Sequence, residues 1–171
     1  MIWTLGLLAA LTVGGCNRHD ERVTPVVTEP ALSRSAPAHA PEVPTHDLSL
    51  DESMGGHTLA RHVARTDGDL RDRLRREQTI SSASTYTDRS TAERVVAAAL
   101  ATADGRLESW RRRSGRRPNL ALDYVGTQSI GRSLMRGQRT PVTCYRAVVV
   151  LRWDERRERD YVLTSYPEAD R

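Results

Sequence analysis

The sequence predicts an α+β domain in which N-terminal helices pack on a C-terminal antiparallel β-sheet. Between residues 57 and 110, apolar side chains recur at the spacing of a helix, and after residue 115 the period changes to two, as in strands. A polar segment over residues 156–160 separates the last two apolar stretches, as a hairpin loop does. Helices that precede antiparallel strands are typical of the α+β class.

Three helices are expected, in this order. A short helix over residues 57–63 follows Gly55 and Gly56. The second begins after Thr66, a good N-cap that is followed by acidic residues, and runs to Glu77. The third and longest begins at the capping box Ser90-Thr-Ala-Glu93 and continues to the arginine cluster at residues 111–113.

The strands follow the helices. They are expected over residues 120–125, 130–134, 142–153 and 161–166. In the last strand, Thr164 and Tyr166 share one face, whereas Tyr161 and Leu163 point to the other. These elements place one domain at residues 51–171, with no internal repeat.

Arginine supplies every basic residue: the 26 cations include no Lys. Residues 1–50 carry a net charge of −2 and residues 51–171 one of +6. A basic domain suggests an anionic partner such as nucleic acid, and guanidinium groups bind phosphate through paired hydrogen bonds. A genome with biased codon use would also replace Lys by Arg, so a single Arg is weak evidence.

The first 16 residues contain an apolar run that is shorter than a membrane span needs. We interpret residues 1–16 as a signal peptide. Its end, Val13-Gly14-Gly15-Cys16, resembles a bacterial lipobox, in which the Cys16 thiol receives a lipid and anchors an exported protein to a membrane. No Lys or Arg precedes the run, so a plain secretory signal and an accidental apolar start are the alternatives.

Residues 17–50 are expected to form a disordered linker, because they lack a hydrophobic period and are rich in proline. His19, His39 and His46 fall in this segment and are interpreted as solvated tail histidines without metal-ligand spacing. The only other cysteine, Cys144, lies in an apolar stretch and is expected to be a small buried hydrophobe. Two cysteines make no disulfide framework.

His57 and His62 are the only histidines of the predicted domain. They are five residues apart, so on one regular helix they would point in different directions, and no Cys completes a metal site. We therefore expect neither a metal nor another cofactor. His62 is followed by several arginines, which favour its neutral form and suit it to act as a general base.

The histidine segment and the last strand are expected to form opposite walls of one cleft. A His, an Arg and a Thr/Tyr strand could take a proton from a hydroxyl, hold a phosphate and protonate or stabilise a leaving oxygen. This set fits RNA cleavage by the 2′-hydroxyl, and it fits simple anion binding equally well.

Several segments of the chain resemble one known family. The first is Gly55-Gly-His-Thr-Leu-Ala-Arg-His-Val-Ala-Arg-Thr-Asp67, and the others follow in the same order: Ala83-Ser-Thr-Tyr-Thr-Asp-Arg-Ser-Thr-Ala-Glu-Arg94, Leu120-Ala-Leu-Asp-Tyr124, Gly131-Arg-Ser-Leu134 and Val162-Leu-Thr-Ser-Tyr-Pro167. They resemble the bacterial ribonuclease A-like toxin domain, which ends CdiA-type contact-dependent growth inhibition proteins and other polymorphic toxins. The resemblance covers about residues 54–168.

The resemblance implies a ribonuclease A-like fold without disulfides and a metal-independent endoribonuclease that leaves a 2′,3′-cyclic phosphate. It assigns catalysis to His62, phosphate stabilisation to Arg73, and phosphate positioning with assistance to proton transfer to Thr164 and Tyr166. His57 would have a structural or supporting role. RNA would be the substrate, interbacterial competition the setting and a cognate immunity protein the partner. Family domains usually end large toxins, whereas this one follows a short leader.

Two other functions fit the same sequence. A non-catalytic lipoprotein could bind an anionic polymer or a protein through its arginines, without any need for His62 or Tyr166. An enzyme of the same fold could also act on a different phosphate ester.

Overall fold

The computed structural model describes residues 45–170. The expected signal peptide with Cys16, and most of the expected linker over residues 17–50, lie outside these residues. Within the described part, no helix is both long enough and apolar enough to cross a membrane. The elements are α1 (Leu48–Ser53), α2 (Thr58–His62), α3 (Asp67–Arg76), β1 (Ser82–Tyr86), α4 (Arg89–Thr102), α5 (Asp104–Arg111), β2 (Leu120–Val125), β3 (Gly131–Met135), β4 (Val142–Cys144), β5 (Arg146–Asp154) and β6 (Arg159–Glu168).

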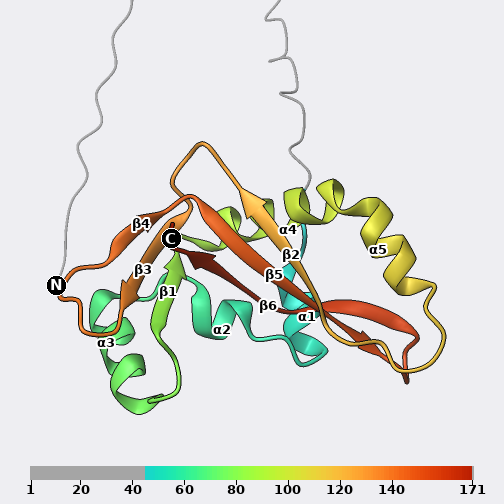
Figure 1. Ribbon diagram of the computed structural model, residues 1–171, viewed down its shortest axis with the longest axis horizontal. Coiled ribbons are helices and arrows are strands. Elements are labelled where there is room, and N and C mark those ends of the chain that lie inside the picture. Colours follow the sequence, from blue (N-terminus) through green and yellow to red (C-terminus); the bar gives the residue numbers. More distant parts are fainter. Residues whose placement is uncertain (1–44, 171) are drawn as a thin grey trace, which may run out of the picture. The chain divides into compact units, whose positions relative to one another are not determined.

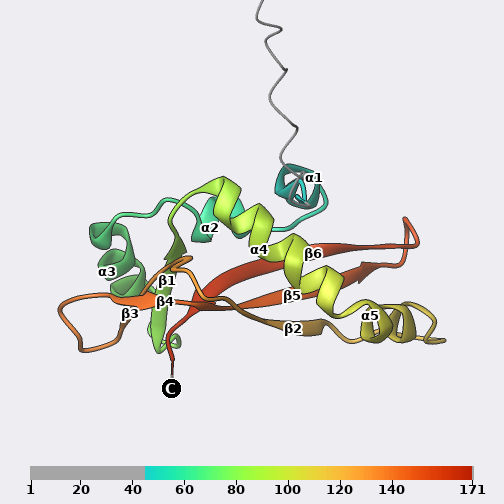
Figure 2. The same ribbon diagram turned by 90° about the horizontal axis from the view of Figure 1, so that it is seen from above.

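The α+β class is confirmed, but the strands form two sheets (Figure 1). One sheet has the order β1-β3-β4 and the other the order β2-β5-β6, and all their pairs are antiparallel. Helix α4 contacts β1 of the first sheet and both β2 and β5 of the second, while α2 contacts β1 and β6. Figure 2 shows α1 and α2 beside β6, so the short helices and this last strand are neighbours.

The main core lies between α4, α5 and the β2-β5-β6 sheet. It contains Val95 and Val96 of α4 and Val149 of β5, each at most 1 % exposed. A smaller cluster, formed by Leu70, Leu74, Ala83 and Leu134, fixes α3 on the first sheet. Cys144 is fully buried, as its sequence context predicted.

The strand expected over residues 142–153 is two strands, so that expectation was wrong. The chain pairs with β3 as far as Cys144 and with β2 from Arg146 onward. The exposed residue between them, Tyr145, marks the point where the chain leaves one sheet for the other. Strand β1 was not predicted, because its polar residues Ser84 and Thr85 are buried and give no apolar alternation.

The long helix expected from the capping box at Ser90 also differs. Asp88 is the N-cap, and its carboxylate accepts a hydrogen bond from the Thr91 backbone N–H. Glu93 accepts instead from the Leu48 backbone N–H and from Arg89. At Ala103 the helix ends, and α5 continues in its place.

The fold begins before residue 51, where the linker was expected to end. Leu48 is fully buried in the main core, and α1 extends over Leu48–Ser53. His46 is not a solvated tail residue, because its Nε2 lies 2.6 Å from the carboxylate of buried Asp51. That carboxylate also accepts a hydrogen bond of 2.7 Å from the backbone N–H of Val162. Asp51 therefore joins the start of the domain to β6.

Candidate active site

One cavity of about 380 Å³ collects all four side chains that the sequence analysis selected, His62, Arg73, Thr164 and Tyr166. They come from four places in the fold: the end of α2, the middle of α3 and two positions of β6. The loop between α3 and β1 and the start of β1 complete its wall. The cavity therefore has the two opposite walls that were expected, the histidine segment on one side and the last strand on the other.

Helix α2 is attached to β6 by hydrogen bonds to the backbone of that strand. The backbone N–H of His57 donates to the carbonyl of Leu163 over 3.0 Å, and that of Ser165 donates to the Thr58 hydroxyl over 2.8 Å. Gly56 makes this approach possible, because a Cβ at its position would lie 2.6 Å from the Val162 carbonyl oxygen. The Gly-Gly-His segment thus sets the distance between His62 and the strand opposite.

His62 ends α2 and is 6 % exposed. Its Nδ1 lies 3.2 Å from the backbone carbonyl oxygen of Ser84. Because a carbonyl oxygen only accepts, Nδ1 carries the proton of the neutral ring and Nε2 keeps its lone pair. The ring also lies against that of Tyr166, with 5.5 Å between centroids and an interplanar angle of 34°.

Arg73 helps to hold His62 in its neutral form. Its Nη1 lies 3.5 Å from both Nδ1 and Nε2 of the imidazole. Burial, and after it the charge of Arg73, lower the pKa of His62 to about 3. The guanidinium is itself fixed by Glu77, the C-cap residue of α3, whose carboxylate lies 3.4 Å from Arg73 Nε. At neutral pH the site therefore presents an unprotonated imidazole next to a permanent cation.

Thr164 and Tyr166 point into the cavity from the same face of β6, as the alternation predicted. The strand is irregular just before Thr164, where a β-bulge pairs Val150 with Thr164 but Leu151 with Val162. Burial, and secondarily Glu168, raise the pKa of Tyr166, so its hydroxyl is protonated at neutral pH.

The Thr164 hydroxyl has no hydrogen-bond partner within residues 45–170, although its Oγ1 is buried. Buried hydroxyls are almost always paired, and an unpaired one costs free energy. The Thr164 hydroxyl can both donate and accept a hydrogen bond. It lines a cavity beside an Arg, and this position suits the binding of an oxyanion.

His57 was expected to have only a structural or supporting role, yet it lines the same cavity as His62. The directions expected from one regular helix do not apply, because His57 is the N-cap of α2, with φ −150° and ψ 25°, and not part of the helix. Burial and the charge of Arg61 lower the pKa of His57. Ser84 and the loop residues Thr79, Ile80 and Ser81 were missed as well, since short polar residues in a loop carry no distinguishing pattern.

Within residues 45–170, no three His, Cys, Asp or Glu side chains gather as metal ligands would. Independence from metal remains a prediction. The residues present can supply a base at His62 Nε2, a fixed positive charge at Arg73 and two hydroxyls opposite them. This arrangement suits proton transfer at a phosphate ester.

Comparison with known proteins gives two matches. The family model described as the bacterial CdiA-CT RNAse A domain matches residues 56–167. A chain from the crystal structure of a CdiA-CT/CdiI complex from Y. kristensenii 33638 is similar in structure, with a TM-score of 0.60 and 29 % sequence identity. The match covers 67 % of the present chain and 100 % of the other. No curated protein sequence matches.

Proposed function

The chain belongs to the family of bacterial CdiA-CT RNase A domains, and on this premise we propose that it is an endoribonuclease toxin that cleaves RNA without a metal ion. One observation supports this proposal most strongly. The cavity holds a neutral imidazole with an unprotonated Nε2, a guanidinium whose Nη1 lies 3.5 Å from that Nε2, and an unpaired Thr164 hydroxyl opposite. A non-catalytic anion site would need the guanidinium alone.

In the proposed reaction, the Nε2 atom of His62 takes the proton of an RNA 2′-hydroxyl. The 2′-oxygen then forms a bond to phosphorus, and the bond from phosphorus to the 5′-oxygen breaks. Arg73 and the Thr164 hydroxyl bind the non-bridging oxygens, whose negative charge increases in the transition state. The protonated Tyr166 hydroxyl gives its proton to the leaving 5′-oxygen. The products are a 2′,3′-cyclic phosphate and a 5′-hydroxyl.

The positions of the ionisable groups suit these roles. A base must be unprotonated at working pH, and burial together with the charge of Arg73 keeps His62 neutral. An effective base also needs a pKa near the working pH, and the negative charge of a bound phosphate beside the imidazole would raise the pKa of His62 toward it. An acid must hold its proton, and burial of Tyr166 provides that. Arg73 remains charged throughout, which an ammonium in a buried site would not guarantee.

The biological setting is part of the proposal. The similar solved structure is that of a complex of CdiA-CT with CdiI, which supports a cognate immunity protein as a partner of this chain. The toxin would act in competition between bacteria. Residues 1–16 would direct export, with Cys16 as the lipid attachment site. The sequence motif alone supports these last two points.

The test is incubation of the purified full-length chain with total RNA in excess EDTA, beside its His62→Ala variant. Cleavage by the wild type alone, with cyclic phosphate ends, supports the proposal. Cleavage that stops in EDTA and returns with a divalent metal contradicts metal independence. If neither protein cleaves RNA, and circular dichroism shows both folded, the chain is a binding module.

A further inference from the structure

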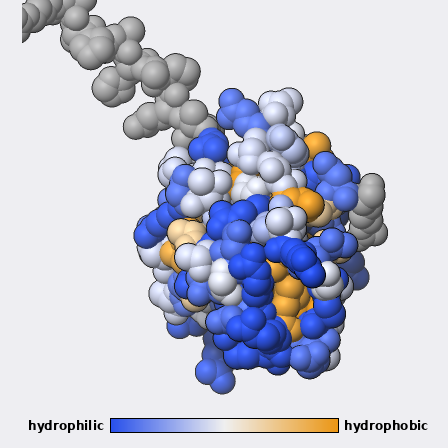
Figure 3. Space-filling model, turned by 90° about the vertical axis from the view of Figure 1, so that its left-hand side faces the viewer, coloured by the Kyte–Doolittle hydropathy of each residue, from blue (hydrophilic) through white to orange (hydrophobic). Residues whose placement is uncertain are grey.

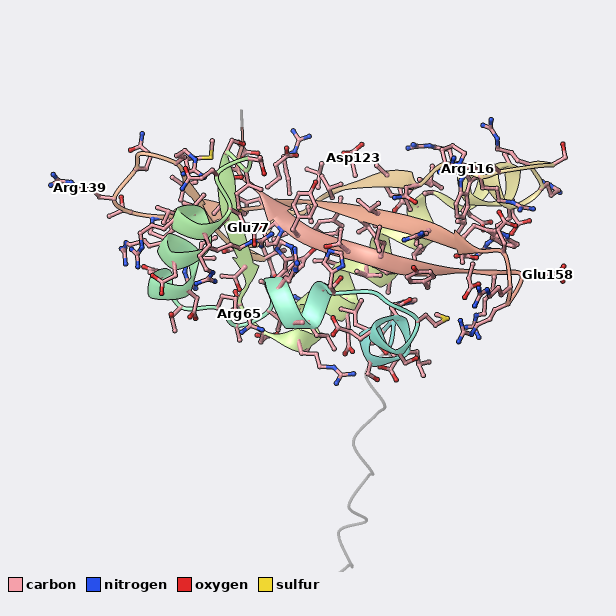
Figure 4. The ribbon with its side chains drawn as sticks, turned by 90° about the horizontal axis from the view of Figure 1, so that it is seen from below. Arg65, Glu77, Arg116, Asp123, Arg139 and Glu158 are labelled. Atoms are coloured by element: carbon pink, nitrogen blue, oxygen red, sulfur yellow. The ribbon has the colours of Figure 1, made fainter. Side chains whose placement is uncertain are left out.

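A second cavity, of about 240 Å³, adjoins the candidate active site. It lies between the end of α2 and the exposed side of α3, and Arg73 lines both cavities. Its charged side chains are those of Arg61, Arg65, Arg73, Arg76, Asp69 and Glu77. Figure 4 labels Arg65 and Glu77, which lie close to α2 and α3.

The two carboxylates of this cavity have hydrogen-bond or ion-pair partners of their own, although Arg65 and Arg76 lie near enough to Asp69 to help its hydrogen bonds lower its pKa. Asp69 closes the capping box of α3, where it accepts from the backbone N–H and the hydroxyl of Thr66. Glu77 pairs with Arg73. Neither carboxylate lies within ion-pair distance of Arg61 or Arg76, and no other described carboxylate does.

Arg65 adds a cation that is held in place by carbonyl groups. Its Nη2 donates to the carbonyl oxygens of Leu59 and Ala60 at the end of α2. Its Nε is buried and has no partner among the described residues. The charge of Arg65 is therefore fixed at this wall without a carboxylate to neutralise it within 4 Å.

Arg61 connects this charge to the active site. It lies close enough to both His57 and His62 to lower the pKa of each. Because Arg73 lines both cavities, an anion that extends from the first cavity into the second enters a space that is also lined by Arg61 and Arg76. Strongly hydrophilic side chains cover most of this end of the domain, around a narrow hydrophobic patch (Figure 3).

We propose that this second cavity, with Arg61 and Arg76 as its free cations, binds a second phosphate of the RNA chain, next to the phosphate that is cleaved. This inference rests on the proposed function, since it takes the polymer in the first cavity to be RNA. A polyanion places its phosphates in series, and guanidinium groups without carboxylate partners are what such a backbone binds. The enzyme would then favour oligonucleotides over dinucleotides.

The test measures binding and not cleavage. The probes are a dinucleotide and a pentanucleotide in which every ribose lacks the 2′-hydroxyl, so that the attacking group is absent. Their affinities for the full-length wild type, for Arg61→Ala/Arg76→Ala and for Arg116→Ala are measured over a range of salt concentrations. Arg116 is an exposed arginine at the opposite end of the domain, so its replacement shows the effect of losing one positive charge far from the second cavity (Figure 4).

We expect the wild type and Arg116→Ala to bind the pentanucleotide at least about tenfold more tightly than the dinucleotide. The double variant should lose most of this advantage while its affinity for the dinucleotide stays within about twofold. Its slope of log affinity against log salt should fall by about 0.7 for each phosphate that the protein no longer neutralises. A wild type without a length advantage, or a double variant that keeps it, overturns the second phosphate site.

These outcomes separate the two proposals. If the wild type shows the length-dependent binding through Arg61 and Arg76 but cleaves no RNA in EDTA, the site stands and the proposed catalysis fails. If RNA is cleaved but the double variant binds the pentanucleotide as the wild type does, the catalysis stands and the site fails.

Discussion

The Nη1 atom of Arg73 lies 3.5 Å from each ring nitrogen of His62, so a permanent cation rests against an imidazole that is only 6 % exposed. A second positive charge on His62 would face this guanidinium in a poorly solvated site. The pair therefore remains singly charged down to a pH of about 3. The pair combines an imidazole that can accept a proton with a fixed positive charge. Two titrating groups would not keep this combination of charges over the same pH range.

Replacement of Arg73 should separate its charge from its shape. Arg73→Lys keeps the cation, so the pKa of His62 should remain well below 6.5, but a point charge cannot reproduce paired contacts and cleavage should fall at least about tenfold. Arg73→Ala removes the charge, and the pKa of His62 should rise, though not fully, because burial is the larger cause. NMR titration of the His62 ring measures the first effect and RNA cleavage the second. A His62 pKa that is the same in all three proteins would contradict the coupling.

His62 should also make the stability of the domain depend on pH. Its pKa is about 3 in the folded chain and near 6.5 when unfolded, so the unfolded state binds the additional proton between these values. The stabilisation is complete above pH 6.5 and declines as the pH falls, by up to about 1.4 kcal/mol per unit. His62→Gln should flatten this part of the profile, measured by urea unfolding at each pH.

His46 provides a control of opposite sign. The hydrogen bond that His46 donates to the Asp51 carboxylate raises the pKa of His46; burial lowers it by less, and the charge of Asp51 raises it further. Its contribution is complete below pH 6.5 and is lost as the pH rises through the folded pKa. His46→Gln should therefore lose stability mainly on the acid side.

Equal pH profiles for wild type and His62→Gln would mean that His62 is less buried than the structure shows.

The four residues selected from the sequence lie together in one cavity, whereas several of the elements around them were not predicted. Periodicity located β2 and the return strand, and family resemblance selected four of the residues that line the cavity of the candidate active site. Local pattern could not reveal β1, because Ser84 and Thr85 are buried by tertiary contacts. Thr85 is satisfied by the Arg65 backbone N–H and the Tyr86 carbonyl, and no helix or strand period signals these partners. The same limit hid His57, whose direction depends on the N-cap backbone of α2.

Gly56 should be intolerant of any side chain. A Cβ there would lie 2.6 Å from the Val162 carbonyl oxygen and 2.9 Å from that of Asp51, and both are backbone atoms that cannot move alone. Gly56→Ala should lower the free energy of unfolding by about 2 kcal/mol and reduce cleavage, because α2 must move away from β6. The matched control is Gly105→Ala in α5, where a Cβ meets nothing within 4 Å and a gain in stability of up to about 1 kcal/mol is expected. Gly56→Ala with wild-type stability and activity would show that the α2–β6 distance is not critical.

Cys16 tests the proposed anchor. If its thiol carries a lipid, Cys16→Ser should move the full-length chain from the membrane fraction to the soluble fraction of the producing cells. A second readout is mass spectrometry, in which the wild type should be heavier by the lipid. Unchanged fractionation together with an unmodified Cys16 would leave the plain secretory signal or the accidental apolar start.

Thr164→Val separates function from structure at the opposite wall. The Thr164 hydroxyl is buried and unpaired within residues 45–170, so its replacement by a methyl group removes no hydrogen bond. The free energy of unfolding should stay within about 1 kcal/mol of the wild-type value or rise. Cleavage should nevertheless fall about tenfold or more, because the transition state loses a hydrogen-bond donor.

Thr58→Val is the comparison that gives this result its meaning. The Thr58 hydroxyl is equally buried, but it accepts a hydrogen bond of 2.8 Å from the Ser165 backbone N–H. Its removal leaves a buried donor unpaired and should cost about 1 to 3 kcal/mol. Unfolding curves and cleavage rates of both variants are measured together. A Thr164→Val protein that is clearly destabilised but cleaves RNA normally would show that this hydroxyl belongs to the fold, whereas the opposite pattern assigns it to the bound phosphate.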